Sequence, residues 1–119
     1  MKYLCLIYDE GKKMDALSRS EADAFMAEYF AFTEGIKQSG HYVGGEALQP
    51  VQTATSVRVR AGKVSTTDGP FAETKEQLGG FYLINADNLD DAIKVAAKIP
   101  SARFGTIEVR PVVDFSQPT

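Results

Sequence analysis

The sequence has a single cysteine and a single histidine among its 119 residues. Cys5 alone cannot form an internal disulfide or build a cysteine-based metal site. His41 alone likewise excludes a zinc site with several histidine ligands. Neither a phosphate-binding glycine loop nor a Ser-His-Asp motif is present, which argues against a kinase or a hydrolase. We therefore expect no metal and no organic cofactor.

The sequence also lacks a long apolar run and an excess of positive charge. Lysine and arginine number 13 against 16 acidic residues, which gives a net charge of −3. Binding to nucleic acid or to an anionic membrane needs a concentrated positive field, so neither partner is expected. No stretch is long enough to span a bilayer, and the opening residues do not form a signal peptide. These features predict a soluble cytoplasmic protein of one domain.

The first half of the sequence predicts a strand and a long helix. Residues 2–10 are apolar at both odd and even positions, which is typical of a strand that is covered on both faces. A loop over residues 11–17 should follow. A helix over residues 18–40 begins with a capping box, formed by Ser18 with Glu21 or by Ser20 with Asp23, and ends at a left-handed glycine, Gly40.

The second half predicts five strands and a second helix. Residues 41–48 form a short strand. Residues 53–60 and 64–67 form a hairpin that turns at Gly62, with Val57 and Val59 facing the core. The strand at 79–86, the helix at 88–100 and the strand at 105–113 complete the domain. The apolar face of this helix is expected to consist of Leu89, Ala92, Ile93 and Ala96.

This order of elements predicts an α+β fold, the ferredoxin-like βαββαβ arrangement with an inserted hairpin. Two helices cover one face of such a sheet, yet the strands at 2–10 and 79–86 are apolar on both faces. A second copy of the chain is the simplest cover, so we expect a homodimer. The alternative is a few exposed apolar side chains, which are normal when they occur singly. The domain is expected to span residues 1–113, with a loose tail at 114–119.

Four segments carry a resemblance to a known family. They are KYLCLIYDE at residue 2, GGEALQP at residue 44, DGPFAETKEQLGGFYLI at residue 68 and IEVRPV at residue 107. Together they resemble the YCII-related (DGPF-domain) family, in the same order and over nearly the whole chain. The resemblance implies a dimeric α+β barrel of ferredoxin-like protomers. It also implies an association with extracytoplasmic-function sigma factors, which are involved in stress signalling.

The resemblance implies less about chemistry. Some distant relatives have a histidine–aspartate pair suspected of acid–base work, and one is similar to a dehydrochlorinase acting on chlorinated hydroquinones. Their histidine lies near the first strand and helix, where this sequence has none. Of that family pattern, only Asp68 has a counterpart here.

Asp68 is the predicted catalytic residue. If Phe71 and a dimer partner remove water from its carboxyl, its pKa rises toward a range useful for proton transfer. Aspartate before Gly-Pro is also a turn former, since its side chain accepts hydrogen bonds from nearby backbone N–H groups. The two roles are compatible, and the turn role is the stronger of the two.

Six residues are predicted to bind a substrate. Glu73, Lys75 and Glu76 are expected to line a polar pocket in which Lys75 binds an anionic group; the alternative is a solvated loop with weak ion pairs. Gly79 and Gly80 indicate close approach of the backbone to a ligand or to a neighbouring strand. The remaining candidates for substrate binding are Phe71, Tyr82 and Arg110.

Charged side chains on the outward faces of two strands are a further candidate lining for the dimer cavity. Arg58, Arg60, Glu108 and Arg110 are placed there by strand alternation. They are expected either to bind an anion or to form a salt-bridge network that stabilises the dimer. His41 is interpreted as a helix-terminal residue rather than a proton carrier, and a tyrosine such as Tyr8 as packing.

Two functional hypotheses remain. The first is a cofactor-independent enzyme that performs acid–base chemistry on a small anionic or aromatic molecule in a dimer cavity. Asp68 would transfer the proton, and Lys75 or Arg110 would stabilise the anion. The second is a non-catalytic ligand-binding or regulatory protein associated with sigma-factor signalling. An enclosed cavity beside the Asp68 carboxyl would favour the enzyme, whereas the binding protein can leave Asp68 in a turn.

Overall fold

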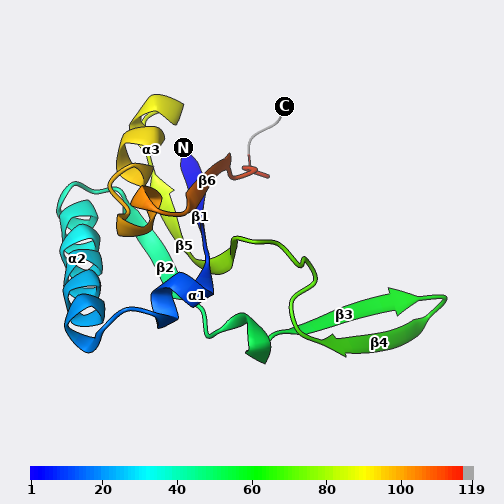
Figure 1. The fold of residues 1–119 in the computed structure, drawn as a ribbon. Coiled ribbons are helices and arrows are strands. Elements are labelled where there is room, and N and C mark those ends of the chain that lie inside the picture. The colour runs from blue at the N-terminus through cyan, green and yellow to red at the C-terminus, as the bar shows by residue number, and fades with distance from the viewer. Residues whose placement is uncertain (117–119) are drawn as a thin grey trace.

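A four-stranded antiparallel sheet forms the body of the chain in the computed structural model, which describes residues 1–116. The sheet has the order β2-β5-β1-β6, and β3 and β4 form a separate two-stranded sheet (Figure 1). The α+β class expected from the sequence is confirmed. The strands are β1 Lys2–Asp9, β2 Tyr42–Ala47, β3 Thr55–Arg60, β4 Lys63–Asp68, β5 Gln77–Asn85 and β6 Thr106–Pro111. The helices are α1 Gly11–Asp15, α2 Arg19–Gln38 and α3 Leu89–Ala96, with short 3₁₀ turns η1 Val51–Thr53 and η2 Pro100–Arg103.

Helix α2 begins and ends where its local signals place it. The Ser18 hydroxyl accepts a hydrogen bond from the Glu21 N–H, and the Glu21 carboxylate accepts one from the Ser18 N–H, so the capping box is complete. Gly40 adopts φ +81°, the left-handed conformation expected after the last turn. The loop predicted at residues 11–17 is wrong in part, because α1 occupies Gly11–Asp15.

The apolar face predicted for α3 is also wrong in part. Leu89 and Ile93 are each 49% exposed, whereas Ala92, Val95 and Ala96 are buried. Both sets have helical spacing, so the sequence pattern alone does not choose between them. The buried set contains two alanines, and such small side chains allow α3 to lie close to the sheet.

The core lies between the helices and one face of the sheet. On β1, Tyr3, Cys5 and Ile7 are buried on this face, with Ile84 of β5 beside them. Phe32 and Ile36 of α2, Val95 of α3 and Ile99 complete the same cluster. Burial raises the pKa of the Cys5 thiol to about 11, so Cys5 behaves as a small apolar core residue.

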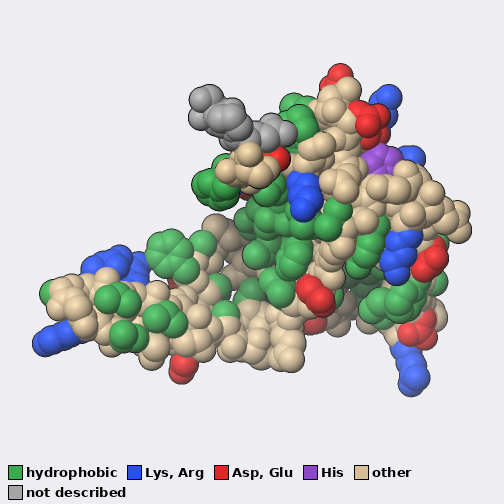
Figure 2. Space-filling view, turned by 180° about the vertical axis from the view of Figure 1, so that it is seen from behind, with side chains coloured by type: hydrophobic (Ala, Val, Ile, Leu, Met, Phe, Trp, Pro, Cys, Tyr) green, Lys and Arg blue, Asp and Glu red, His purple; other side chains and the backbone are tan. Residues whose placement is uncertain are grey.

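Within the described residues, no helix covers the other face of the sheet. Leu4 and Leu6 of β1 lie on it, opposite Leu83 and Phe81 of β5, and all four are partly exposed. Figure 2 shows hydrophobic side chains gathered over the body of the molecule and a further group along the hairpin. We call Leu4, Leu6, Phe81 and Leu83 the open sheet face.

The β3–β4 hairpin projects away from the body (Figure 1). Its turn has positive φ at Ala61 and Gly62, as a two-residue hairpin turn requires, which confirms the prediction for Gly62. The expectation that Val57 and Val59 face the core is wrong: they are 62% and 57% exposed, and Val64 opposite Val59 is 69% exposed. Among residues 1–116 the strands of the hairpin pair only with each other, so its apolar face covers nothing in the described part of the chain.

Gly105 allows the closest backbone approach in the body of the chain. A Cβ atom on Gly105 would overlap the Tyr8 carbonyl oxygen and lie 3.2 Å from Asp9 Cβ. We predict that Gly105→Ala lowers the free energy of unfolding by about 1–3 kcal/mol, because the end of β1 must shift. Gly35→Ala is the control: Gly35 lies in α2 with open space around it, and alanine there should stabilise the chain by about 0.5–1 kcal/mol. Urea denaturation measures both, and a Gly105→Ala protein as stable as wild type would contradict the packing.

Candidate functional site

Asp9, the last residue of β1, lies where two of three surface hollows meet. Strand alternation puts Asp9 on the same face as Ile7, toward α2. Beside it, β5 has one extra residue between the partners of Ile7 and Tyr8. This residue is Gly79, and an added Cβ there would lie 3.7 Å from both Asp9 carboxylate oxygens. The bulge therefore leaves room next to the carboxylate.

The largest hollow, which we call the β1 cavity, has a volume of about 760 Å³. Its walls are Asp9 and Glu10, helix α1, residues 48–52, and the segment from Thr74 to Gly79. A second hollow of about 500 Å³, the loop cavity, lies between residues 48–54 and residues 70–78. Its volume and that of the β1 cavity fall within the range of small-molecule sites.

The third hollow, the helix cleft, has a volume of about 420 Å³ and lies between α2 and the sheet. It shares Asp9, Met14 and Gly79 with the β1 cavity. Its walls include the aromatic side chains of Phe25, Tyr29, Phe30, Tyr42 and Tyr82. Asp9 therefore borders both a cavity with charged residues in its walls and an aromatic cleft.

Asp9 and Glu10 have opposite electrostatic environments although they are neighbours in sequence. Burial raises the pKa of Asp9, and the nearby Glu76 carboxylate raises it further. Glu10 forms ion pairs with Lys13 at 3.3 Å and with Lys75 at 3.4 Å, and these lysines lower its pKa. Two adjacent carboxyls with pKa values pushed apart are the arrangement that acid–base chemistry uses.

Two pairs of hydroxyl groups line the helix cleft. Tyr29 Oη lies 2.6 Å from Ser101 Oγ, and Tyr82 Oη lies 2.7 Å from Thr33 Oγ1. Burial raises the pKa of both tyrosines. Both side chains therefore hold their hydrogens at neutral pH, as uncharged hydrogen-bonding groups beside the carboxyl.

Comparison with known proteins gives the family. The pattern of the YCII-related domain matches residues 1–116. The chain belongs to the YCII-related family. The Uncharacterized protein R00369 of Rhizobium meliloti (strain 1021) is 37% identical over 114 residues, which cover 94% of this chain and 92% of that protein. The resemblance seen in the sequence is thus confirmed.

Of the tail predicted at residues 114–119, residues 117–119 lie outside the described part.

The YCII-related segment that begins at Asp68 connects the end of β4 in the hairpin to β5 in the sheet. Asp68 ends β4 and is exposed, and it does not line any of the three hollows. Within residues 1–116 its carboxylate accepts no hydrogen bond. The turn is instead held by the Gly69 N–H, which donates to the Ala54 carbonyl at 2.7 Å, and by the Ser56 hydroxyl, which donates to the Gly69 carbonyl at 2.9 Å. The catalytic role of Asp68 stays a prediction.

Four of the other predicted site residues lie around the hollows, and one of them is Tyr82 in the helix cleft. Phe71 lines the loop cavity and is exposed, with the Arg58 guanidinium 5.2 Å above its ring. Lys75 lines the β1 cavity. The Glu76 carboxylate lies next to that cavity and raises the pKa of Asp9 by charge repulsion. Glu73 is exposed and outside the lining of the three hollows.

Tyr82 and Arg110 lie on opposite faces of the sheet. Tyr82 stands opposite Cys5, on the face toward α2, whereas Arg110 stands opposite Leu4, on the open sheet face. Arg110 donates a 2.6 Å hydrogen bond to Glu108 two residues away on the same strand. The predicted site residues are thus divided among three places within one chain.

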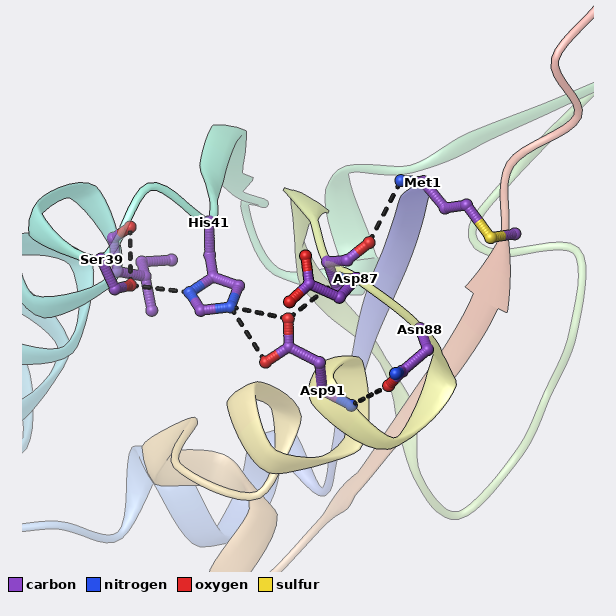
Figure 3. A network of polar contacts seen from close by, with 8 residues as sticks. Met1, Ser39, His41, Asp87, Asn88 and Asp91 are labelled. Carbon is purple, nitrogen blue, oxygen red and sulfur yellow. Dashed lines mark hydrogen bonds and ion pairs between the residues drawn. The ribbon is translucent and has the colours of Figure 1, made fainter.

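His41 belongs to a separate network at the other end of the sheet (Figure 3). Its ring connects Ser39 Oγ, 2.7 Å from Nδ1, with the Asp91 carboxylate, 3.0 Å from Nε2. The Asp87 N–H and His41 both lower the pKa of Asp91. Ser39 caps α2, and Asp91 lies in the first turn of α3. The network therefore joins two helix ends, away from the three hollows.

Asp9 was not among the residues selected from the sequence. The signal that was present is an acidic pair, Asp9 and Glu10, at the end of a buried strand, since the ends of strands commonly carry functional groups. Among residues 1–116, no group of three or more His, Cys, Asp or Glu side chains is arranged to hold a metal ion. In the same described part of the chain, no helix has the length and apolar character needed to cross a lipid bilayer.

The raised pKa of Asp9 predicts how the substitution of this residue changes the stability of the folded chain. Folding favours the protonated carboxyl, so ionisation of Asp9 destabilises the folded chain as pH rises through its pKa range. We expect Asp9→Asn to melt at a higher temperature than wild type at pH 7 and at nearly the same temperature at pH 3. Asp15→Asn, at the exposed end of α1, is the control and should change stability by less than about 0.5 kcal/mol. A destabilised Asp9→Asn protein at pH 7 would show that the ionised carboxylate is well solvated or paired.

Proposed function

We propose that the chain is a cofactor-independent enzyme that transfers a proton on a small molecule, with Asp9 as the acid–base group, and that it works as a homodimer. The observation that carries the proposal is the position of the Asp9 carboxyl, at the junction of the β1 cavity and the helix cleft. A general base must lie within hydrogen-bonding reach of a bound substrate. Asp9 satisfies that requirement better than Asp68, which is exposed on the hairpin.

The neighbours of Asp9 suit a proton transfer. Its raised pKa makes the carboxylate a stronger base than that of an ordinary aspartate. The ammonium group of Lys75 stands beside Glu10 on the wall of the β1 cavity, where it would stabilise a developing enolate or phenolate. The base removes a proton from carbon or oxygen and returns it at the same or a neighbouring position. Isomerisation, or elimination when a leaving group is present, uses only these groups.

The homodimer would cover two apolar surfaces that one chain leaves exposed. These are the open sheet face and the valine face of the hairpin, formed by Val57, Val59 and Val64. A two-stranded hairpin is marginal on its own and needs a packing partner. The radius of gyration is 16.5 Å, against about 13.5 Å for a compact chain of this length. The order β2-β5-β1-β6 supports a ferredoxin-like protomer and a barrel formed by two such sheets.

The hairpin predicts a variant that separates the subunits. Val57→Lys combined with Val59→Lys should weaken the dimer roughly a hundredfold, since burying each valine is worth about 1.5 kcal/mol or more. Arg60→Gln, on the opposite face of the hairpin, should leave the dimer intact. Multi-angle light scattering at micromolar concentration would give twice the 13.0 kDa of one chain for wild type. A wild-type monomer would rule out the homodimer.

Proton transfer is tested most directly by hydrogen exchange. Small metabolites are incubated with the protein in D₂O, and carbon-bound deuterium is followed by NMR and mass spectrometry. For a compound that exchanges, Asp9→Asn should lower the rate about a hundredfold or more, and Asp68→Asn should change it only a few-fold. Loss of exchange in Asp68→Asn with full activity in Asp9→Asn would assign the chemistry to Asp68. Saturable binding without exchange would identify a ligand-binding protein instead.

A further inference from the structure

The helix cleft has one polar group whose hydrogen-bonding role can be worked out from its neighbours. The Thr33 hydroxyl has a single hydrogen, which it donates to the Tyr29 carbonyl at 2.9 Å. At the 2.7 Å contact between Thr33 and Tyr82, the Tyr82 hydroxyl must therefore be the donor. Its only hydrogen is then occupied, and the Tyr82 oxygen is left as an acceptor.

The charge of the cleft also restricts its ligand. Among the residues that line it there is no lysine or arginine, and Asp9 lies at its boundary with the β1 cavity. Glu76, beside Asp9, adds a second negative charge nearby. A carboxylate or phosphate in this cleft would lose its hydration and meet only negative neighbours. An uncharged ligand that brings a hydrogen-bond donor fits the same surroundings.

The walls of the cleft suit a flat ring. Phe25 and Tyr29 of α2 form an edge-to-face pair with centroids 5.2 Å apart, and Met26 and Phe30 of the same helix extend the wall. Met26 and Phe30 are largely exposed, so this apolar surface is open to a ligand. Aromatic rings and methionine sulfur both make favourable contacts with an aromatic face or edge.

We propose that the helix cleft binds an uncharged aromatic molecule that carries an O–H or N–H group, and that this group donates a hydrogen bond to Tyr82 Oη. The ring lies against Phe25, Tyr29 and Phe30 of α2. This inference names the substrate class of the proposed enzyme and so rests on the proposed function, because the bound ring would lie beside Asp9. Binding alone tests the inference, so the two can fail separately.

The test uses pairs of probes that differ only in the donor. Phenol is compared with anisole, and indole with 1-methylindole, in titrations followed by ¹H–¹⁵N NMR. We expect phenol and indole to shift the amide signals of α2 and β5 saturably and to bind about five- to tenfold more tightly than their methylated partners, the value of one hydrogen bond. Benzoate, which is an anion, should bind more weakly than phenol. Equal affinity for phenol and anisole, or the absence of binding by all probes, would overturn the inference.

Three variants assign the contact to Tyr82. Tyr82→Phe should reduce phenol binding to the level of anisole and leave anisole unchanged. Thr33→Val releases the Tyr82 hydrogen, so anisole should gain affinity. Tyr42→Phe removes another hydroxyl of the cleft wall and is the control, with phenol binding retained. Phenol binding that persists in Tyr82→Phe would overturn the assignment. Asp9→Asn that binds phenol but catalyses no exchange would leave this inference standing independently of the catalytic proposal.

Discussion

The position of strand β1 is the constraint on which the rest of the structure depends. It hydrogen-bonds to β5 on one side and to β6 on the other, so neither of its edges is free. Its alternate side chains supply both the core under the helices and part of the open sheet face. Gly105 packs against the backbone of β1 at Tyr8, and Gly79 leaves space beside the side chain of Asp9, the last residue of the strand. A strand held in this way fixes the position of the carboxyl at its end, as the proposed proton transfer requires.

The same alternation explains why two neighbouring carboxyls differ. Asp9 turns toward α2, where burial and Glu76 raise its pKa. Glu10 follows the strand and meets Lys13 and Lys75, which lower its pKa. Folding thus favours the protonated form of Asp9 and the ionised, ion-paired form of Glu10. The difference between the two pKa values arises because these adjacent side chains point toward different neighbours.

The apolar surface that this chain leaves uncovered is as informative as its core. The open sheet face and the valine face of the hairpin are separate surfaces of one chain. The two ends of the hairpin, at Ala54 and Pro70, line the loop cavity. A partner that holds the hairpin would therefore also set the shape of that cavity. In this account, assembly and the candidate site are physically connected.

Local signals in the sequence predicted the elements that depend on them. The capping box of α2 with Glu21, the left-handed Gly40 and the hairpin turn at Gly62 each involve a few adjacent residues, and each is confirmed. The buried face of α3 was predicted incorrectly in part, because two stripes with helical spacing compete and only packing against the sheet selects one.

The candidate site was harder to predict than the fold. The hollow beside Asp9 is built by α1, residues 48–52 and residues 74–79, which are far apart in the sequence. A pKa raised by burial depends on that assembly, and no local motif encodes it. The segment that begins at Asp68 identified the family and part of the cavity wall. Sequence alone did not indicate that the carboxyl of Asp68 points to solvent while Phe71 and Lys75 line the hollows.

Titration of the Asp9 side chain is the sharpest test of the proposal that this carboxyl is adapted for proton transfer. A ¹³C NMR titration of the aspartate carboxyls, with Asp9 assigned by its loss in Asp9→Asn, gives the pKa without knowledge of a substrate. We expect a midpoint above the usual value of about 3.9, and a lower midpoint when Glu76 is changed to Gln. A midpoint at or below that usual value, unchanged by Glu76→Gln, would rule out this role for Asp9.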